Sequence, residues 1–179
     1  MAVPVKPQKN LAYAMRRLWA VDVITDAAVP TATEINAGTY LGCYPLSDQG
    51  GPISTPNKVT LATLLCESDT EEDFGKTVHT HPDMTLVYDP TAAPASAGKT
   101  AWDLFIEGYE GNFVWELGTP GDLSDEIAAD ARVTVVPIKS RVISEEPTST
   151  GEEGLLAFQT THVVRAPYTK RNVAVVAGI

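Results

Sequence analysis

The sequence predicts a mainly β protein, a β-sandwich with one flanking α-helix, long loops and an extended N-terminal arm. Runs of β-branched and aromatic residues bounded by turn residues recur along the 179-residue chain, which is the pattern of strands. Only one stretch, residues 98–109, shows a sustained helical period. Many strands and one amphipathic helix bury their apolar surfaces when the helix lies against a sandwich. We expect residues 1–12 to form the arm and residues 13–179 to form a single domain.

Eight strands are predicted from these runs. In the seventh of them, alternating residues share one face, as the two-residue period of a strand requires. That face would carry Leu156, Phe158, His162 and Val164. The predicted strands are Leu18–Ile24, Thr39–Tyr44, Val59–Cys66, Met84–Tyr88, Asn112–Leu117, Arg132–Ile143, Leu155–Ala166 and Asn172–Ala177.

Between the first two strands, the residues from Pro30 to Tyr44 predict a turn, one short capped helix and a return strand. Thr31 and Glu34 have the spacing of a capping box, in which each side chain accepts a backbone N–H at the helix start. Gly38 is expected to end this helix by taking a positive φ. Nothing in the segment is arranged for chemistry on a substrate, so we interpret it as an element that orients two strands.

The main helix is predicted over Gly98–Tyr109. Ser96 is the expected N-terminal cap, and Gly108 and Gly111 are expected to end the helix. Its apolar residues recur at i, i+3, i+4 and i+7, which places them on one stripe facing the core. This stripe consists of Trp102, Phe105, Ile106 and Tyr109.

Three long irregular stretches are predicted as loops, and they suggest surfaces made for partners. Leu46–Asn57 is rich in glycine and proline, Asp89–Ala97 is rich in proline and alanine, and Glu145–Gly154 is polar. Trp19 lies beside two arginines where the arm joins the domain, so we expect a docking contact between subunits there.

The net charge of −10 argues against a protein that binds DNA tightly, because affinity for DNA comes largely from neutralising its phosphates with Lys and Arg. The charge is unevenly distributed, with four cations and no acid in residues 1–20 and five acids in residues 116–130. Another acidic run holds Glu67, Asp69, Glu71, Glu72 and Asp73. Each run taken alone is explained by a solvated loop. The sequence has no apolar run long enough to span a membrane.

The strongest enzymatic candidate is the pair His79 and His81. On a strand, both imidazoles would face the same side and could reach one metal ion. The residues His79-Thr-His-Pro82 also resemble the zinc-binding core of JAMM-type metalloproteases. That family places an aspartate ligand after ten further residues, where this chain has Ala92. We therefore predict strand histidines without a metal, no catalytic residue, no cofactor and no enzymatic activity.

The order strand, Pro-Thr-x-x-Glu-Ile-x-Ala-Gly-Thr, strand over residues 17–44 resembles the N-terminal region of major tail tube proteins. These proteins come from long-tailed bacteriophages, particularly siphoviruses that infect actinobacteria. Further similarity lies in the central helix, in the run from Arg132 to Ile138 after an acidic loop, and in the final strand pair.

The resemblance implies a structural virion protein that forms hexameric rings, which stack into the tail tube through which DNA is delivered. Implied partners are the protein itself, a tape-measure protein, and the tail terminator and baseplate or tip proteins. DNA would pass without specific binding. The protein would reside in the virion tail after assembly in the cytoplasm of the host bacterium.

In this reading, the arm and the long loops bridge subunits or rings, and an acidic lumen lets DNA pass. The candidates for self-assembly are Lys6, Lys9, Arg16, Arg17, Trp19, Leu46 and Ile53. The lumen candidates are the five acids of residues 67–73. Two other classes stay open at this point. A phage decoration or carbohydrate-binding sandwich would be a stable monomer, and a zinc metalloenzyme using His79 and His81 would carry stoichiometric zinc.

Overall fold

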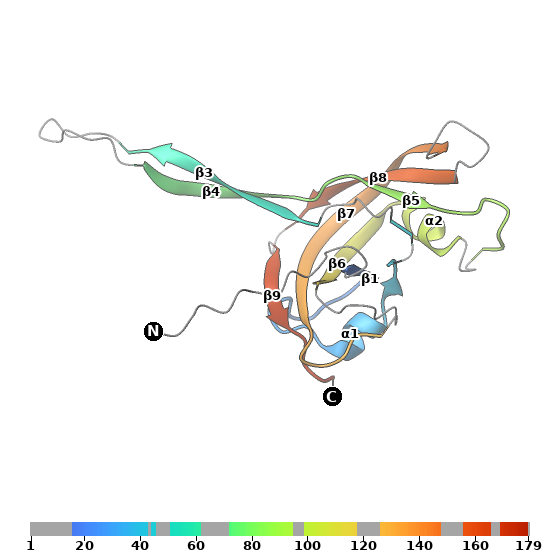
Figure 1. The fold of residues 1–179 in the computed structure, drawn as a ribbon, viewed down its shortest axis with the longest axis horizontal. Coiled ribbons are helices and arrows are strands. Elements are labelled where there is room, and N and C mark those ends of the chain that lie inside the picture. The colour runs from blue at the N-terminus through green and yellow to red at the C-terminus, as the bar shows by residue number, and fades with distance from the viewer. Residues whose placement is uncertain are drawn as a thin grey trace, which may run out of the picture.

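Seven strands form one antiparallel sheet and two more form a separate hairpin in the computed structural model of the chain (Figure 1). The structure describes residues 16–42, 44–45, 51–61, 72–94, 99–117, 126–147, 156–165 and 169–178. The strands are β1 (Arg16–Val21), β2 (Thr39–Tyr40), β3 (Ile53–Thr60), β4 (Glu72–Thr80), β5 (Met84–Val87), β6 (Tyr109–Leu117), β7 (Arg132–Pro147), β8 (Leu156–Val164) and β9 (Lys170–Ala174), and the helices are α1 (Ala32–Asn36) and α2 (Thr100–Phe105).

The sheet has the order β2-β1-β6-β7-β8-β5, and β9 pairs with β7. The 16-residue strand β7 makes this possible because β9 pairs near its beginning and β8 along its second half. A register shift between Val142 and Ser144 interrupts its pairing with β8, and such bulges bend a strand. Figure 1 shows β7 as the long curved strand of the body. The mainly β prediction is therefore confirmed, with the layers supplied by a single sheet that curls.

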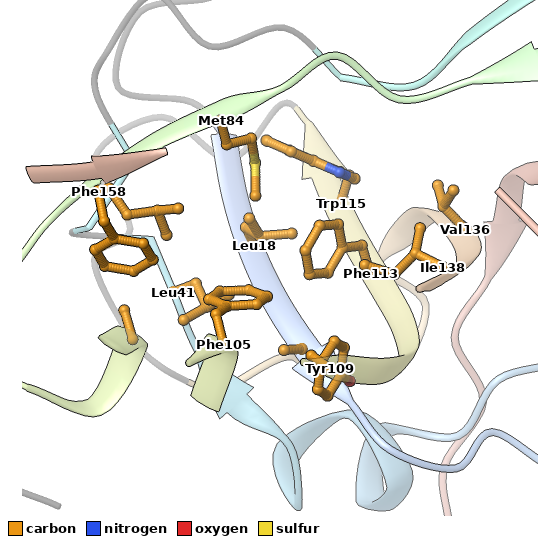
Figure 2. Close-up of a cluster of buried hydrophobic side chains, with 13 residues drawn as sticks. Leu18, Leu41, Met84, Phe105, Tyr109, Phe113, Trp115, Val136, Ile138 and Phe158 are labelled. Atoms are coloured by element: carbon orange, nitrogen blue, oxygen red, sulfur yellow. The ribbon is translucent and has the colours of Figure 1, made fainter. Parts of the chain in front are cut away.

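The first core lies inside the curl and is covered by α2. Leu18 of β1 and Phe113 of β6 meet Phe158 of β8 there, and Phe105 of α2 packs among them (Figure 2). All four side chains are fully buried or nearly so. The other buried members are Ala20, Leu41, Met84, Leu86, Ala101, Tyr109, Trp115, Val136 and Ile138.

The second core lies on the opposite face of the same strands. Because successive side chains of a strand point to opposite faces, Trp19 and Val21 of β1 belong to this core while their neighbours belong to the first. Ile35 of α1 covers it. Its remaining buried members are Val114, Ile127, Val133, Val135 and Val175. The body of the molecule thus buries both faces of its sheet.

The capping box predicted in the Pro30–Tyr44 segment is confirmed. Thr31 accepts the backbone N–H of Glu34 at 3.1 Å, and the Glu34 carboxylate accepts the backbone N–H of Thr31 at 3.0 Å. The prediction for Gly38 was wrong, because Gly108 is the only described glycine with a positive φ. A Cβ on Gly38 would lie 2.6 Å from the Ala20 carbonyl oxygen, so this glycine is needed for close packing against β1.

The helix predicted over Gly98–Tyr109 is shorter than expected. Described residues of this range form α2 only over Thr100–Phe105, and Tyr109 already belongs to β6. Gly108, with φ +93°, turns the chain out of the helix as predicted. Ile106 is exposed instead of lying on the apolar stripe. The predicted cap Ser96 lies outside the described residues.

Strands were predicted near β1, β2, β5, β6, β7, β8 and β9, with ends displaced by a few residues. The region before β5 was predicted wrongly. Ile53–Asn57, expected to be loop, belongs to β3, and β4 was not predicted. Most of the strand expected at Val59–Cys66 lies outside the described residues. Much of the loop expected at Glu145–Gly154 also lies outside them, and its first three residues belong to β7.

Candidate functional site

The hairpin formed by β3 and β4 projects from the body, as Figure 1 shows. Its strands pair from Ile53 opposite Thr80 to Thr60 opposite Glu72. None of its described residues belongs to either core. An isolated two-stranded hairpin is at best marginally stable in water, so this element lacks the support that the body strands give one another.

The hairpin nevertheless exposes large apolar side chains. Phe74 is 69% exposed and Ile53 is 52% exposed, on opposite strands. Val59, Val78 and Leu61, the residue that follows β3, are also exposed. Charged residues lie directly across the hairpin from two of them, with Lys58 opposite Phe74 and Asp73 opposite Val59. The hairpin is therefore a two-sided surface with apolar side chains that the subunit itself does not cover.

At its base, β3 is tied to the last strand of the sheet. The guanidinium of Arg171 in β9 donates to the Pro52 carbonyl at 2.8 Å and to the Ser54 hydroxyl at 3.2 Å. Ser54 also bonds Nδ1 of His79 across the hairpin at 2.8 Å. These contacts fix where the first strand of the hairpin leaves the body.

The chain leaving β4 is fixed by a buried histidine. The indole N–H of Trp115 donates to Nε2 of His81 at 3.2 Å. Nδ1 of His81 must then carry the proton, and it donates to the Pro82 carbonyl at 2.9 Å. The ring is stacked on Trp115 and meets Phe113 edge-on. Burial lowers the pKa of His81, so this imidazole is neutral near pH 7.

His162 of β8 packs against His81, with ring centroids 4.8 Å apart. Its Nδ1 bonds the Ser140 hydroxyl at 2.7 Å and its Nε2 bonds the Thr160 hydroxyl at 3.1 Å. Burial, and then the neighbouring His81, lower the pKa of His162 to about 3. Sequence reasoning missed this pairing, although the alternation that placed His162 on the face of Phe158 correctly indicated its burial.

The two histidines weighed as candidate metal ligands, His79 and His81, do not come together as a ligand set. His79 bonds Ser54 within the hairpin, whereas His81 uses both ring nitrogens at the base. Among the described residues, no group of three or more His, Cys, Asp or Glu side chains could hold a metal ion.

Two predicted docking residues lie inside the subunit. Trp19 is fully buried in the second core. Arg17 is buried as well, forms an ion pair with Glu116 and lies over the Trp19 ring. Its guanidinium also donates to the Glu126 carbonyl at 3.0 Å. Both side chains thus serve the fold in the single subunit.

The other predicted residues are either on the hairpin or outside the described part. Ile53 begins β3. Glu72 and Asp73 begin β4, and the exposed Asp73 carboxylate accepts the Phe74 backbone N–H. Arg16 begins β1. Outside the described residues lie Lys6, Lys9, Leu46, Glu67, Asp69 and Glu71.

Comparison with known proteins gives one family. Residues 3–177 match the family model described as phage tail tube protein, while no curated protein matches the chain. No helix in the described ranges is long and apolar enough to cross a membrane. The match covers nearly the whole sequence, including the curled sheet, both cores and the projecting hairpin. The chain therefore belongs to the phage tail tube protein family and is a structural component of the virion tail.

Proposed function

We propose that this protein is the repeating subunit of a tail tube of the siphovirus type found in phages of actinobacteria. Six copies form a ring, and rings stack head to tail into the conduit for DNA. Membership of the tail tube family supports the structural role. In this proposal the protein catalyses no reaction and assembles in the cytoplasm of the host bacterium, around a tape-measure protein and between terminator and baseplate or tip proteins.

The observation that carries self-assembly is the hairpin with its uncovered apolar side chains. Phe74, Ile53 and Val78 gain nothing from the cores of their own subunit. A second copy of the same chain is the occupant we propose for this surface. Such a head-to-tail contact between different surfaces of identical subunits generates a ring when its rotation closes and an open tube when it does not.

Burial of these side chains is expected to contribute enough free energy to drive association between subunits. Burying the exposed part of a Phe side chain contributes about 2 kcal/mol, and the hairpin offers four further large apolar side chains. Aromatic residues are enriched at the centres of protein interfaces. Because each subunit in a tube repeats the contact, a modest free energy per contact makes assembly depend steeply on protein concentration.

Charge supports the passage of DNA. A surface with net charge −10 repels a polyanion, so a lumen lined with acids would let DNA move without binding. We propose Glu72 and Asp73 of β4, with Glu67, Asp69 and Glu71, as lumen candidates. Lys6, Lys9, Arg16 and Leu46 remain our candidates for contacts between subunits, together with the arm of residues 1–12.

Purified protein should form rings or rods at high concentration, visible by negative-stain electron microscopy and as fast species in sedimentation velocity. Phe74→Asp should raise the concentration needed for assembly by at least about tenfold, which corresponds to about 1.4 kcal/mol per contact. Its thermal unfolding as a monomer should remain close to that of the wild type, because Phe74 supports no core.

The matched control is Val23→Asp, which places the same charge on a residue that is 72% exposed in the body, outside the hairpin. This variant should assemble like the wild type. A monodisperse monomer at all salt and protein concentrations would contradict the proposal and favour a decoration or carbohydrate-binding module. Equal loss of assembly in both variants would show that the effect is not specific to the hairpin, and would contradict its place in the interface.

A further inference from the structure

We propose that His81 and His162 make the base of the hairpin sensitive to acid. While both imidazoles are neutral, they hold the end of β4 against the sheet, and protonation of the pair releases that side of the hairpin while the body stays folded. This inference concerns the single subunit and does not depend on tube assembly.

The hydrogen bonds of His81 require the neutral ring. Trp115 donates to Nε2, so that nitrogen must offer a lone pair. A proton added at Nε2 would set two N–H donors against each other over 3.2 Å. The bond between the chain leaving β4 and strand β6 would then be lost, and a cation would remain in an apolar site.

The surroundings of His162 also favour a neutral ring. The Thr160 hydroxyl donates to the Met84 carbonyl at 3.3 Å, so its oxygen accepts the proton of His162 Nε2. Nδ1 then accepts the hydroxyl proton of Ser140. The ring centroids of His81 and His162 are 4.8 Å apart, a separation at which two cations repel strongly in a buried site.

Little charge is available to offset a cation in this cluster. Of the described residues that face the pair, Phe113 and Trp115 come from β6, Ser140 from β7, Thr160 from β8 and Met84 from β5, and none is charged. Asp83 is the acid that favours protonated His81, but burial outweighs it and the pKa of His81 is lowered. Burial likewise lowers the pKa of His162.

The geometry favours a local release over loss of the whole fold. β5 pairs with β8 only over residues 157–160, and beyond that point the His81 ring covers His162. On the other side of the hairpin, Arg171 holds Pro52 and Ser54 through hydrogen bonds that involve neither His81 nor His162. Acid should therefore free the β4 side first.

Hydrogen exchange of the full-length protein, read by mass spectrometry below its assembly concentration, tests this. Once the site opens, the imidazoles return to the ordinary pKa of 6.5, so opening becomes easier as the pH falls below that value, before the closed site itself is protonated. Between about pH 7.5 and pH 4.5, protection in peptides covering residues 72–86 should therefore fall at least about tenfold after correction for intrinsic exchange, while β6 peptides keep theirs. His81→Gln, whose amide oxygen can accept the Trp115 proton without titrating, should move this transition down by about one pH unit.

The control is His79→Gln, which removes a histidine near the end of β4 that lies outside the pair, and it should follow the wild type. Equal shifts in both variants, or simultaneous loss of protection in residues 72–86 and β6, would overturn the proposal. If His81→Gln does not fold, the indole N–H resonance of Trp115 in the wild type gives the answer. It should shift together with the loss of protection, and a resonance unchanged through that transition would also overturn the proposal.

Discussion

The body and the hairpin of this subunit are built on opposite principles. In the body, β1 and β6 send alternate side chains into two cores, so both faces of the sheet are covered. In the hairpin, β3 and β4 have only each other as strand partners, and their apolar side chains are exposed. The body thus carries the free energy of folding, whereas the hairpin presents surface whose burial requires another molecule.

Under the proposed self-assembly, this division would let the subunit be stable as a monomer and still offer apolar surface for association. Hydrophobic burial contributes roughly in proportion to the apolar area removed from water. Area already buried in the body stabilises the monomer, and area left open on the hairpin remains for the proposed contact between subunits. Matched substitutions in the two regions should separate these two contributions.

The largest effect is expected from truncating a core aromatic. Phe113→Ala should lower the free energy of unfolding by about 3–5 kcal/mol, because the fully buried ring contacts Phe105, Tyr109 and both members of the histidine pair. Phe74→Ala should change it by less than about 0.5 kcal/mol. Urea unfolding of the monomers at neutral pH measures both values. A cost at Phe74 similar to that at Phe113 would mean that the hairpin belongs to the folding core.

A middle-sized effect is expected from adding one methyl group to a glycine. Gly38→Ala should cost about 1–3 kcal/mol, because the new Cβ would lie 2.6 Å from the Ala20 oxygen and 2.7 Å from the Val21 side chain. At Gly51, just before the hairpin, a Cβ would meet nothing within 4 Å. Gly51→Ala should therefore leave the thermal unfolding temperature unchanged or slightly raised. Equal effects at the two sites would show that the close packing around Gly38 does not determine the stability cost of the added methyl group.

The smallest effect is expected at the capping box. Thr31→Ala should cost about 1 kcal/mol at neutral pH, and Thr31→Ser should restore most of it. The backbone N–H groups of Thr25 and Thr31 lower the pKa of Glu34 from 4.5 to about 2. The folded protein therefore resists protonation at this carboxyl, and its contribution, present above pH 4.5, is lost as the pH falls toward 2. Chemical unfolding measures this loss. The difference in free energy of unfolding between Glu34→Gln and the wild type should narrow as the pH falls from 4.5 toward 2.

Local sequence signals predicted the body well. The Thr31–Glu34 spacing identified α1 because a capping box involves residues only three apart. Alternation identified the buried face of β8 at Phe158 and His162, but Leu156, predicted on the same face, is exposed. Most body strands were found because their β-branched runs are bounded by turn residues.

The hairpin escaped prediction because its residues carry the signals of a loop. Pro56 lies within β3, and Glu72 and Asp73 begin β4, all residue types that are depleted in strands. Exposure on both sides also removes the alternation that marks a half-buried strand. The histidine pair could not be inferred either, since His81 and His162 are brought together only by the curl of the sheet.

The pairing of the C-terminal residues with α1 has a consequence for synthesis. Val176 pairs in parallel with Thr31, exchanging backbone bonds with Ala32 and Pro30, and Val175 is buried in the second core. A growing chain therefore cannot complete that core until residue 176 has left the ribosome. Any chain that stops short of Val175 would lack this pairing and would leave the second core open beside α1.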